Sequence, residues 1–307
     1  MTVNDMLCAG CRSLFVCVFI AVSFSTLSKE HGYDDIYKEV LVIKKFFAKQ
    51  ATINRDRMEM LELSDVQPIH VYAMATTLNE KVAILNHLLG FPFVTRPEFP
   101  KSDIAARHIH ELVKAIQKNV KQLNSETTFQ SIPVNGKDPV DVYRQIMACN
   151  LLVDTLLKNK VTPKYPLMMV QRLKEVLSYA MLQTEQNLPP SPLALYENVQ
   201  PKDVFIVAEN LLKLLMSSAH LKFQVNYPSR PYYVPQERHM IKPIHVFTIT
   251  VVNMIILEDV IRRMELQIPK VANLPINVGI TPAHVYSAYE EVSLLAHYFL
   301  LNRKAVK

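Results

Sequence analysis

The residues best able to do chemistry in this chain occupy one position of a short phrase that occurs five times. The phrase reads Pro-x-His/Asp-Val-Tyr/Phe and spans residues 68–72, 139–143, 201–205, 243–247 and 282–286. Its third position holds His70, Asp141, Asp203, His245 and His284. Three imidazoles and two carboxylates on one face could coordinate a transition metal or bind an acidic ligand. These five residues are therefore candidate ligand-binding residues.

A simpler interpretation of the phrase is that it starts helices. Proline is favoured at the first helical position, where its missing N–H costs no hydrogen bond. An acidic side chain two positions later accepts hydrogen bonds from free backbone N–H groups and complements the helix dipole. Histidine fits less well, because a protonated imidazole is disfavoured beside the positive helix end. Helix initiation is the preferred interpretation, and the three histidines are what it leaves unexplained.

Other chemical motifs are weaker. The sequence contains no HExxH, GxSxG or Walker motif, which are the signatures of the common zincins, serine hydrolases and NTPases. His108 and His110 lie two residues apart, so on a helix they point about 200° away from each other. Cys149 lies among apolar helix residues, where a buried structural cysteine is expected. We predict no catalytic residue, no metal site and no cofactor, and favour a protein that is not an enzyme.

Glycine and proline usage predicts an all-α fold. The chain has only five glycines, and its nineteen prolines separate stretches of helical periodicity. We expect αα-hairpin-like pairs, arranged as an irregular helical-repeat array or as paired four-helix bundles. The polar stretch 127–138 marks a soft boundary between helical parts 29–126 and 139–307, which could also form one continuous domain. Eight amphipathic segments of the mature chain are expected to be helices, at about 34–60, 68–89, 104–123, 139–158, 166–181, from 201, from 243 and 282–303.

The N-terminal residues 1–28 predict a signal peptide. The apolar run 14–24 makes only about half of a membrane-spanning helix, and small residues suited to cleavage follow it. Initiation at Met6 would remove Asp5 and give a more conventional signal. The alternatives are an uncleaved membrane anchor or a buried helix. Cleavage would leave Cys149 as the only cysteine, without a partner for an internal disulfide. We expect a periplasmic or secreted protein with no stable membrane span after cleavage.

Charge and loop composition indicate which partners to expect. The net charge of +6 is dispersed without a run of basic residues, which argues against nucleic-acid binding. Loops rich in proline and aromatic residues, among them the one holding Tyr232 and Tyr233, are candidate contact edges. The leading hypothesis is an exported, non-enzymatic helical-repeat binding protein for a peptide, a small ligand or a protein in the cell envelope. The alternatives are a metal- or small-molecule-binding protein that uses the repeated His/Asp positions, and a structural envelope protein.

Overall fold

The computed structural model describes residues 32–51, 66–92, 96–123, 133–190, 196–227, 235, 237–270 and 279–301. The all-α prediction is confirmed, because these residues form eight α-helices and one short 3-10 helix, η2, with no strand among them. Residues 1–28, which hold the predicted signal peptide, lie outside this part. The elements are α2 (Tyr33–Ala51), α3 (Pro68–Leu88), α4 (Ala106–Leu123), α5 (Pro139–Leu157), α6 (Lys164–Gln183), α7 (Pro201–Phe223), η2 (Arg238–Met240), α8 (Pro243–Arg263) and α9 (Pro282–Leu301).

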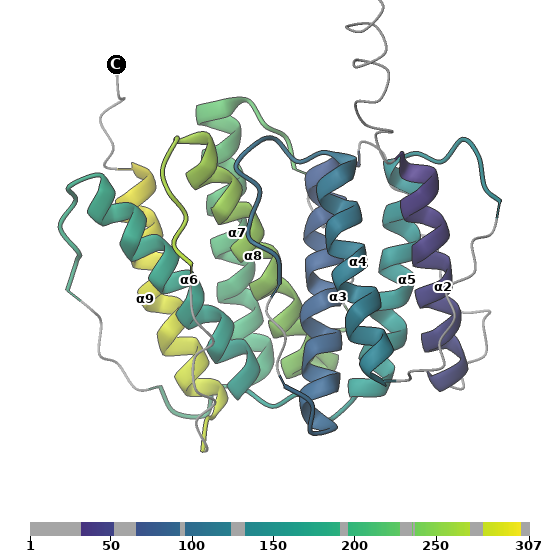
Figure 1. The fold of residues 1–307 in the computed structure, drawn as a ribbon. Coiled ribbons are helices and arrows are strands. Elements are labelled where there is room, and N and C mark those ends of the chain that lie inside the picture. The colour runs from purple at the N-terminus through teal and green to yellow at the C-terminus, as the bar shows by residue number, and fades with distance from the viewer. Residues whose placement is uncertain are drawn as a thin grey trace, which may run out of the picture.

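The helices pack as two groups of four, α2–α5 and α6–α9 (Figure 1). In each group the first and second helices both contact the third and fourth, so the two groups share one packing scheme. The main contact between the groups is made by α3 against α8. The expected paired four-helix bundles describe this arrangement. The division into domains 29–126 and 139–307 stays a prediction, although in the packing α5 lies with α2–α4.

Within each group the helices run parallel, so the expectation of αα-hairpins is wrong. The first residues of α6, α7, α8 and α9 all line one pocket. In the other group, α3 and α5 are joined side by side at matching heights by Lys81–Asp154 and by the Asn150 amide on the Met74 carbonyl. Helices of about 20 residues are roughly 30 Å long, so each parallel neighbour needs a long return connection. The proline-rich loops 89–105, 184–200, 224–242 and 264–281 supply these returns.

The two groups point in opposite directions. Arg262, near the end of α8, forms an ion pair of 2.8 Å with Asp103, just before α4. At the other end, Lys81 in the later half of α3 lies close enough to His245, at the start of α8, to lower its pKa. Helices α2–α5 therefore end where α6–α9 begin, at the bottom of Figure 1. We call this end of the molecule the lower end.

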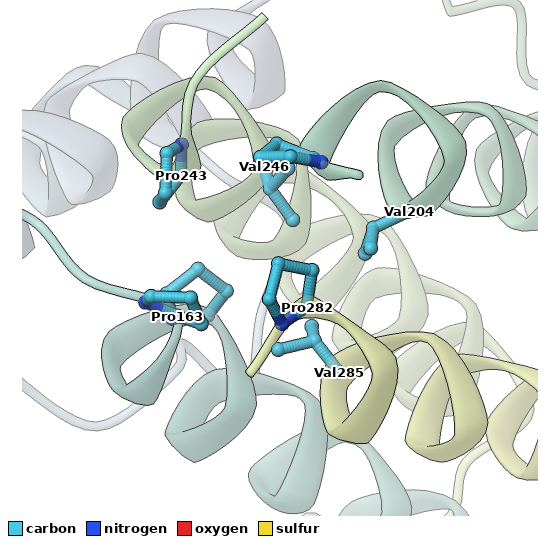
Figure 2. A pocket seen from close by; sticks show the side chains of 8 residues that line it. Pro163, Val204, Pro243, Val246, Pro282 and Val285 are labelled. Atoms are coloured by element: carbon cyan, nitrogen blue, oxygen red, sulfur yellow. The ribbon is translucent and has the colours of Figure 1, made fainter. Parts of the chain in front are cut away.

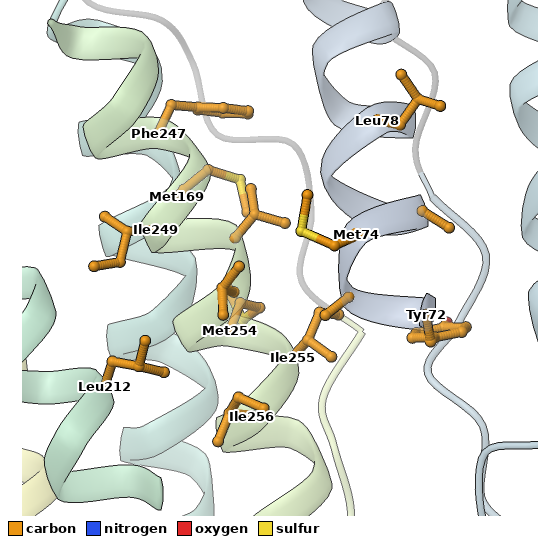
Figure 3. Packing of buried hydrophobic residues seen from close by; sticks show 14 of the residues in the cluster. Tyr72, Met74, Leu78, Met169, Leu212, Phe247, Ile249, Met254, Ile255 and Ile256 are labelled. Atoms are coloured by element: carbon orange, nitrogen blue, oxygen red, sulfur yellow. The ribbon is translucent and has the colours of Figure 1, made fainter. Parts of the chain in front are cut away.

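Helices α3 and α8 form the centre of the fold. Nearly every residue of α8 is buried, including the valine- and isoleucine-rich stretch 251–257, which is helical as predicted. Figure 3 shows apolar side chains of α3 and α8 facing each other across the join. Among the described helices, α7 and α8 are long and apolar enough to cross a membrane, but the apolar window of α8 is 94% buried and that of α7 50%. The burial of α8 is what the core helix of a folded protein shows.

Several helix boundaries differ from those expected. Helix α4 begins at Ala106 and not at 104, and α6 begins at Lys164, ahead of the expected start at 166. Gly90 ends α3, with φ +87° and the paired backbone hydrogen bonds of a Schellman motif. Leu89, expected on the buried stripe of this helix, is instead 59% exposed.

Candidate functional site

The four helices of the second group begin around one apolar pocket at the lower end (Figure 2). Three copies of the repeated phrase meet here, each contributing the proline at its first position and the valine at its fourth. Proline carries no N–H, and the valines begin the buried stripe of each helix, so the pocket is apolar although helix N-termini surround it. The lining residues are Pro163, Pro166, Pro201, Val204, Pro243, Val246, Pro282 and Val285.

The size of the pocket restricts what it could hold. Even when the open solvent at its mouth is included, the empty space in the pocket is only about 200 Å³. Sites for cofactors and drug-sized ligands are usually larger, at roughly 300–1,000 Å³. The pocket is therefore a shallow apolar recess, too small for a cofactor or a drug-sized ligand.

Each phrase histidine caps its own helix. The backbone N–H three residues earlier donates to the imidazole Nδ1, over 2.9 Å at His70, 3.0 Å at His245 and 3.2 Å at His284. Asp203 accepts the equivalent hydrogen bond from the Gln200 N–H at 2.9 Å. The helix-start interpretation is thus confirmed, and it covers the histidines that it had left unexplained. His108 accepts the same bond, at 3.1 Å, although no proline precedes it and sequence reasoning missed it.

The capping bond requires a neutral imidazole, because Nδ1 must offer its lone pair. Burial lowers the pKa of His70 to about 4, against a smaller opposing effect of Asp259. Burial also lowers the pKa of His245 to about 4, and the nearby Lys81 and Lys242 act in the same direction. At neutral pH both side chains are therefore uncharged acceptors, which removes the conflict with the positive helix end.

The structure does not bring the five candidate positions together. His70 and Asp141 begin α3 and α5 at the upper end, whereas Asp203, His245 and His284 begin α7, α8 and α9 at the lower end. The described residues contain no group of three or more His, Cys, Asp or Glu side chains that could hold a metal ion. A ligand-binding role for each of the five stays a prediction.

The remaining candidates divide as follows. Asp141 lies in the first turn of α5, where its backbone N–H donates to the Asp138 carboxylate at 2.9 Å and Lys137 lies 3.5 Å away. Tyr232 and Tyr233 lie outside the described residues. Cys149 is fully buried on α5, as predicted, and burial raises the pKa of its thiol to about 12.

A set of buried charges around α3 escaped sequence reasoning. Lys81, only 1% exposed, pairs with Asp154 at 2.7 Å. Arg96 pairs with Glu258 of α8. On an amphipathic surface helix the Lys81 position would face water, but α3 has α4, α5 and α8 around it. Its sequence signal is faint: Asn79-Glu80-Lys81 is a short polar stretch within an otherwise apolar helix.

Arg96 and Asp103 hold the segment before α4 against α8. Arg96 reaches Glu258, Asp103 pairs with Arg262, and Phe99 packs edge-on against Tyr72 at 5.7 Å between ring centroids. Burial raises the pKa of Glu80, which lies in the same region with Arg172 at 3.8 Å. Removing one partner of a buried ion pair leaves an uncompensated charge, so the buried pairs Arg96–Glu258 and Glu80–Arg172 favour this one docking of the two groups.

Comparison of the chain with protein-family models, with curated proteins and with solved structures finds no match. The class that the structure defines is therefore architectural. It is an all-α protein with two groups of four helices. The helices within each group run parallel, and the two groups point in opposite directions. Its function has to be argued from its surfaces.

Proposed function

We propose that this chain is an exported, non-enzymatic binding protein that recognises an apolar side chain of a protein or peptide partner. The contact site is the pocket where α6–α9 begin. The observation that carries the proposal is the convergence of three phrase copies on this one pocket. A repeated helix start needs its proline for initiation alone, yet here the same prolines also form the wall of an open apolar recess.

The chemistry of the pocket supports binding through shape and apolar burial. Its lining offers proline rings and valine methyl groups without an ionisable side chain. Apolar anchors that fill small recesses contribute much of the free energy in protein–protein recognition. The stiff proline rings hold the recess open before binding, which reduces the entropic cost of association. Lys164 is the first residue of α6 and Lys202 the second of α7, so polar side chains lie near the pocket in the chain.

Export is the second part of the proposal and rests on residues 1–28. The apolar run 14–24 followed by small residues supports a periplasmic or secreted location. The partner would then be a protein or peptide of the cell envelope or its surroundings. N-terminal sequencing of the exported chain would test cleavage directly, and an intact Met1 or Met6 would contradict it.

Peptide selection tests the binding site. A random peptide library displayed on phage should yield ligands with one recurrent apolar residue. Val204→Thr with Val285→Thr keeps the shape of the pocket but adds two hydroxyl groups, so affinity should fall at least about tenfold. Val207→Thr is the matched control, because Val207 is partly buried on α7 and does not line the pocket. Selected peptides that bind the double variant as tightly as the unmodified chain would contradict the proposal.

A further inference from the structure

We propose that the lower end docks on membranes containing anionic phospholipids, and that the turn 88–91 enters the interfacial region. This inference goes beyond the proposed function and does not depend on it, because it concerns different residues and a lipid partner. It rests on an exposed apolar turn, on unpaired basic side chains at the same end, and on the charges that surround them.

The apolar turn follows α3. Leu89 is 59% exposed, and Leu88 and Phe91 are each 38% exposed. Gly90 between them has open space around it, so the turn projects from the surface and does not line a groove. The N–H of Phe91 donates to the Asn86 carbonyl at 3.0 Å and that of Gly90 to the His87 carbonyl at 3.1 Å. The turn is therefore already formed, and its insertion would cost little conformational entropy.

The same end carries exposed basic side chains. Lys158 and Lys160 lie in the connection between α5 and α6, next to the end of α3 because α3 and α5 run parallel. The Lys242 ammonium donates to Asn159 at 3.2 Å, which brings the start of α8 beside this connection. Just before α8, Met240 adds a further apolar side chain that is 54% exposed.

Among the described residues of the lower end, basic side chains outnumber acidic ones. Four helices begin there and four end there, so their dipoles largely oppose one another. Of the acidic residues there, Glu237 pairs with His239 at 3.1 Å, Asp203 accepts from the Gln200 N–H, and Glu197 is exposed just before α7. In the described part of this end, six basic side chains form no ion pair, namely Lys158, Lys160, Lys164, Lys202, Arg238 and Lys242.

At the opposite end of the molecule, several basic side chains are in ion pairs. There, Lys137 pairs with Asp141, Arg262 with Asp103, and Lys114 with Glu39. Basic side chains without an ion pair, Lys158 and Lys160 among them, thus lie beside the exposed apolar turn. Reversible membrane attachment usually needs two such signals, apolar insertion and electrostatic attraction to anionic headgroups. An acidic protein partner would match the charge, but a projecting apolar turn fits a lipid interface better than a folded surface.

The chain contains no tryptophan, so one introduced tryptophan reports on its surroundings without background. We expect Leu89→Trp to show a blue shift in emission, and quenching by brominated lipids, with phosphatidylcholine vesicles that contain 30% phosphatidylglycerol. Pure phosphatidylcholine vesicles should give neither effect. Leu221→Trp is the control, because Leu221 is 81% exposed near the end of α7, at the upper end. The chain is measured in full and also without residues 1–28, which precede every described contact and are themselves partly apolar.

Vesicle co-sedimentation separates the contributions of electrostatic attraction and apolar insertion to membrane binding. Lys158→Gln with Lys160→Gln should weaken binding to the anionic vesicles roughly twentyfold, since each lysine near an anionic surface contributes about a fivefold effect. Lys45→Gln with Lys213→Gln, which changes two exposed lysines on the sides of the molecule, should leave it unchanged. Leu89→Ser with Phe91→Ser should weaken binding roughly tenfold or more. The proposal is overturned if Leu89→Trp gives no anion-dependent shift, or if Leu221→Trp shifts equally. Binding that salt abolishes but the serine variants retain would also overturn it, in favour of an acidic macromolecule.

Discussion

The capping role of His70 makes a quantitative prediction about stability and pH. Its pKa is about 4 in the folded chain, against 6.5 for an unperturbed histidine, and the side chain is only 1% exposed. Between these two pH values the unfolded chain binds more protons than the folded chain, so stability rises with pH. The contribution is complete above pH 6.5 and is lost as the pH falls towards 4. From pH 7.5 to pH 4.5 the loss amounts to about 2.5 kcal/mol.

His70→Asn isolates this contribution. The asparagine carboxamide is close in shape to Asp203, which accepts the same capping bond in α7, and it does not titrate in this range. At pH 7.5 we expect the variant to be less stable by about 1 kcal/mol, because the smaller side chain fills the site less well. At pH 4.5 the order should reverse, since only the histidine chain loses the titration-linked free energy.

Urea unfolding followed by far-UV circular dichroism, at several pH values from 4.5 to 7.5, measures the difference between the two chains. Other groups titrate in both proteins and cancel in that difference. His284→Asn, at an exposed helix start with the same capping bond, reports the effect of exchanging the capping group alone at pH 7.5. The assignment of a neutral, buried capping histidine would be refuted by one result. In that case, the difference in unfolding free energy between His70→Asn and the unmodified chain would change by less than about 0.5 kcal/mol from pH 7.5 to 4.5.

Two further predictions concern the buried charge pair and the buried thiol. Lys81→Met should lower the free energy of unfolding by about 3–5 kcal/mol, because it leaves Asp154 without its partner. Adding Asp154→Leu should restore most of the loss. An unfolding midpoint in urea that does not recover in the double variant would contradict this prediction. In a chain without residues 1–28, Cys149 is the only cysteine, and its burial and its pKa of about 12 predict that a disulfide reagent at pH 8 reacts at least about a hundredfold more slowly with folded than with urea-unfolded protein. Comparable rates in the two states would show that the thiol is accessible.

Local sequence signals were sufficient for the helices themselves. Prolines at 68, 139, 201, 243 and 282 each begin an α-helix, and Gly90 ends one, because φ preferences and missing N–H groups act within a single turn. The burial of Cys149 also followed from its neighbours, since the apolar face of α5 carries it. These predictions depend on interactions between residues close in the chain.

Directions between helices could not be predicted in the same way. Hairpin-like pairs were expected, but the helices of each group run parallel, because connections such as 89–105 and 184–200 are long enough to return along a whole helix. An amphipathic pattern identifies the buried face of a helix, but it does not indicate the direction of the neighbouring helix. The burial of Lys81 was missed for the same reason, since only contact with α8 on the far side of α3 removes that side chain from water.

For the candidate site, the sequence by itself determined which residues start helices and that histidine or aspartate stands at each third position. Whether those positions meet was decided by tertiary structure alone. Because α2–α5 and α6–α9 point in opposite directions, His70 and Asp141 are separated from Asp203, His245 and His284, and three prolines and three valines of the phrase meet at the lower end instead. The local pattern repeats because each helix start obeys the same short-range rules, whereas the pocket exists only because four such starts pack side by side.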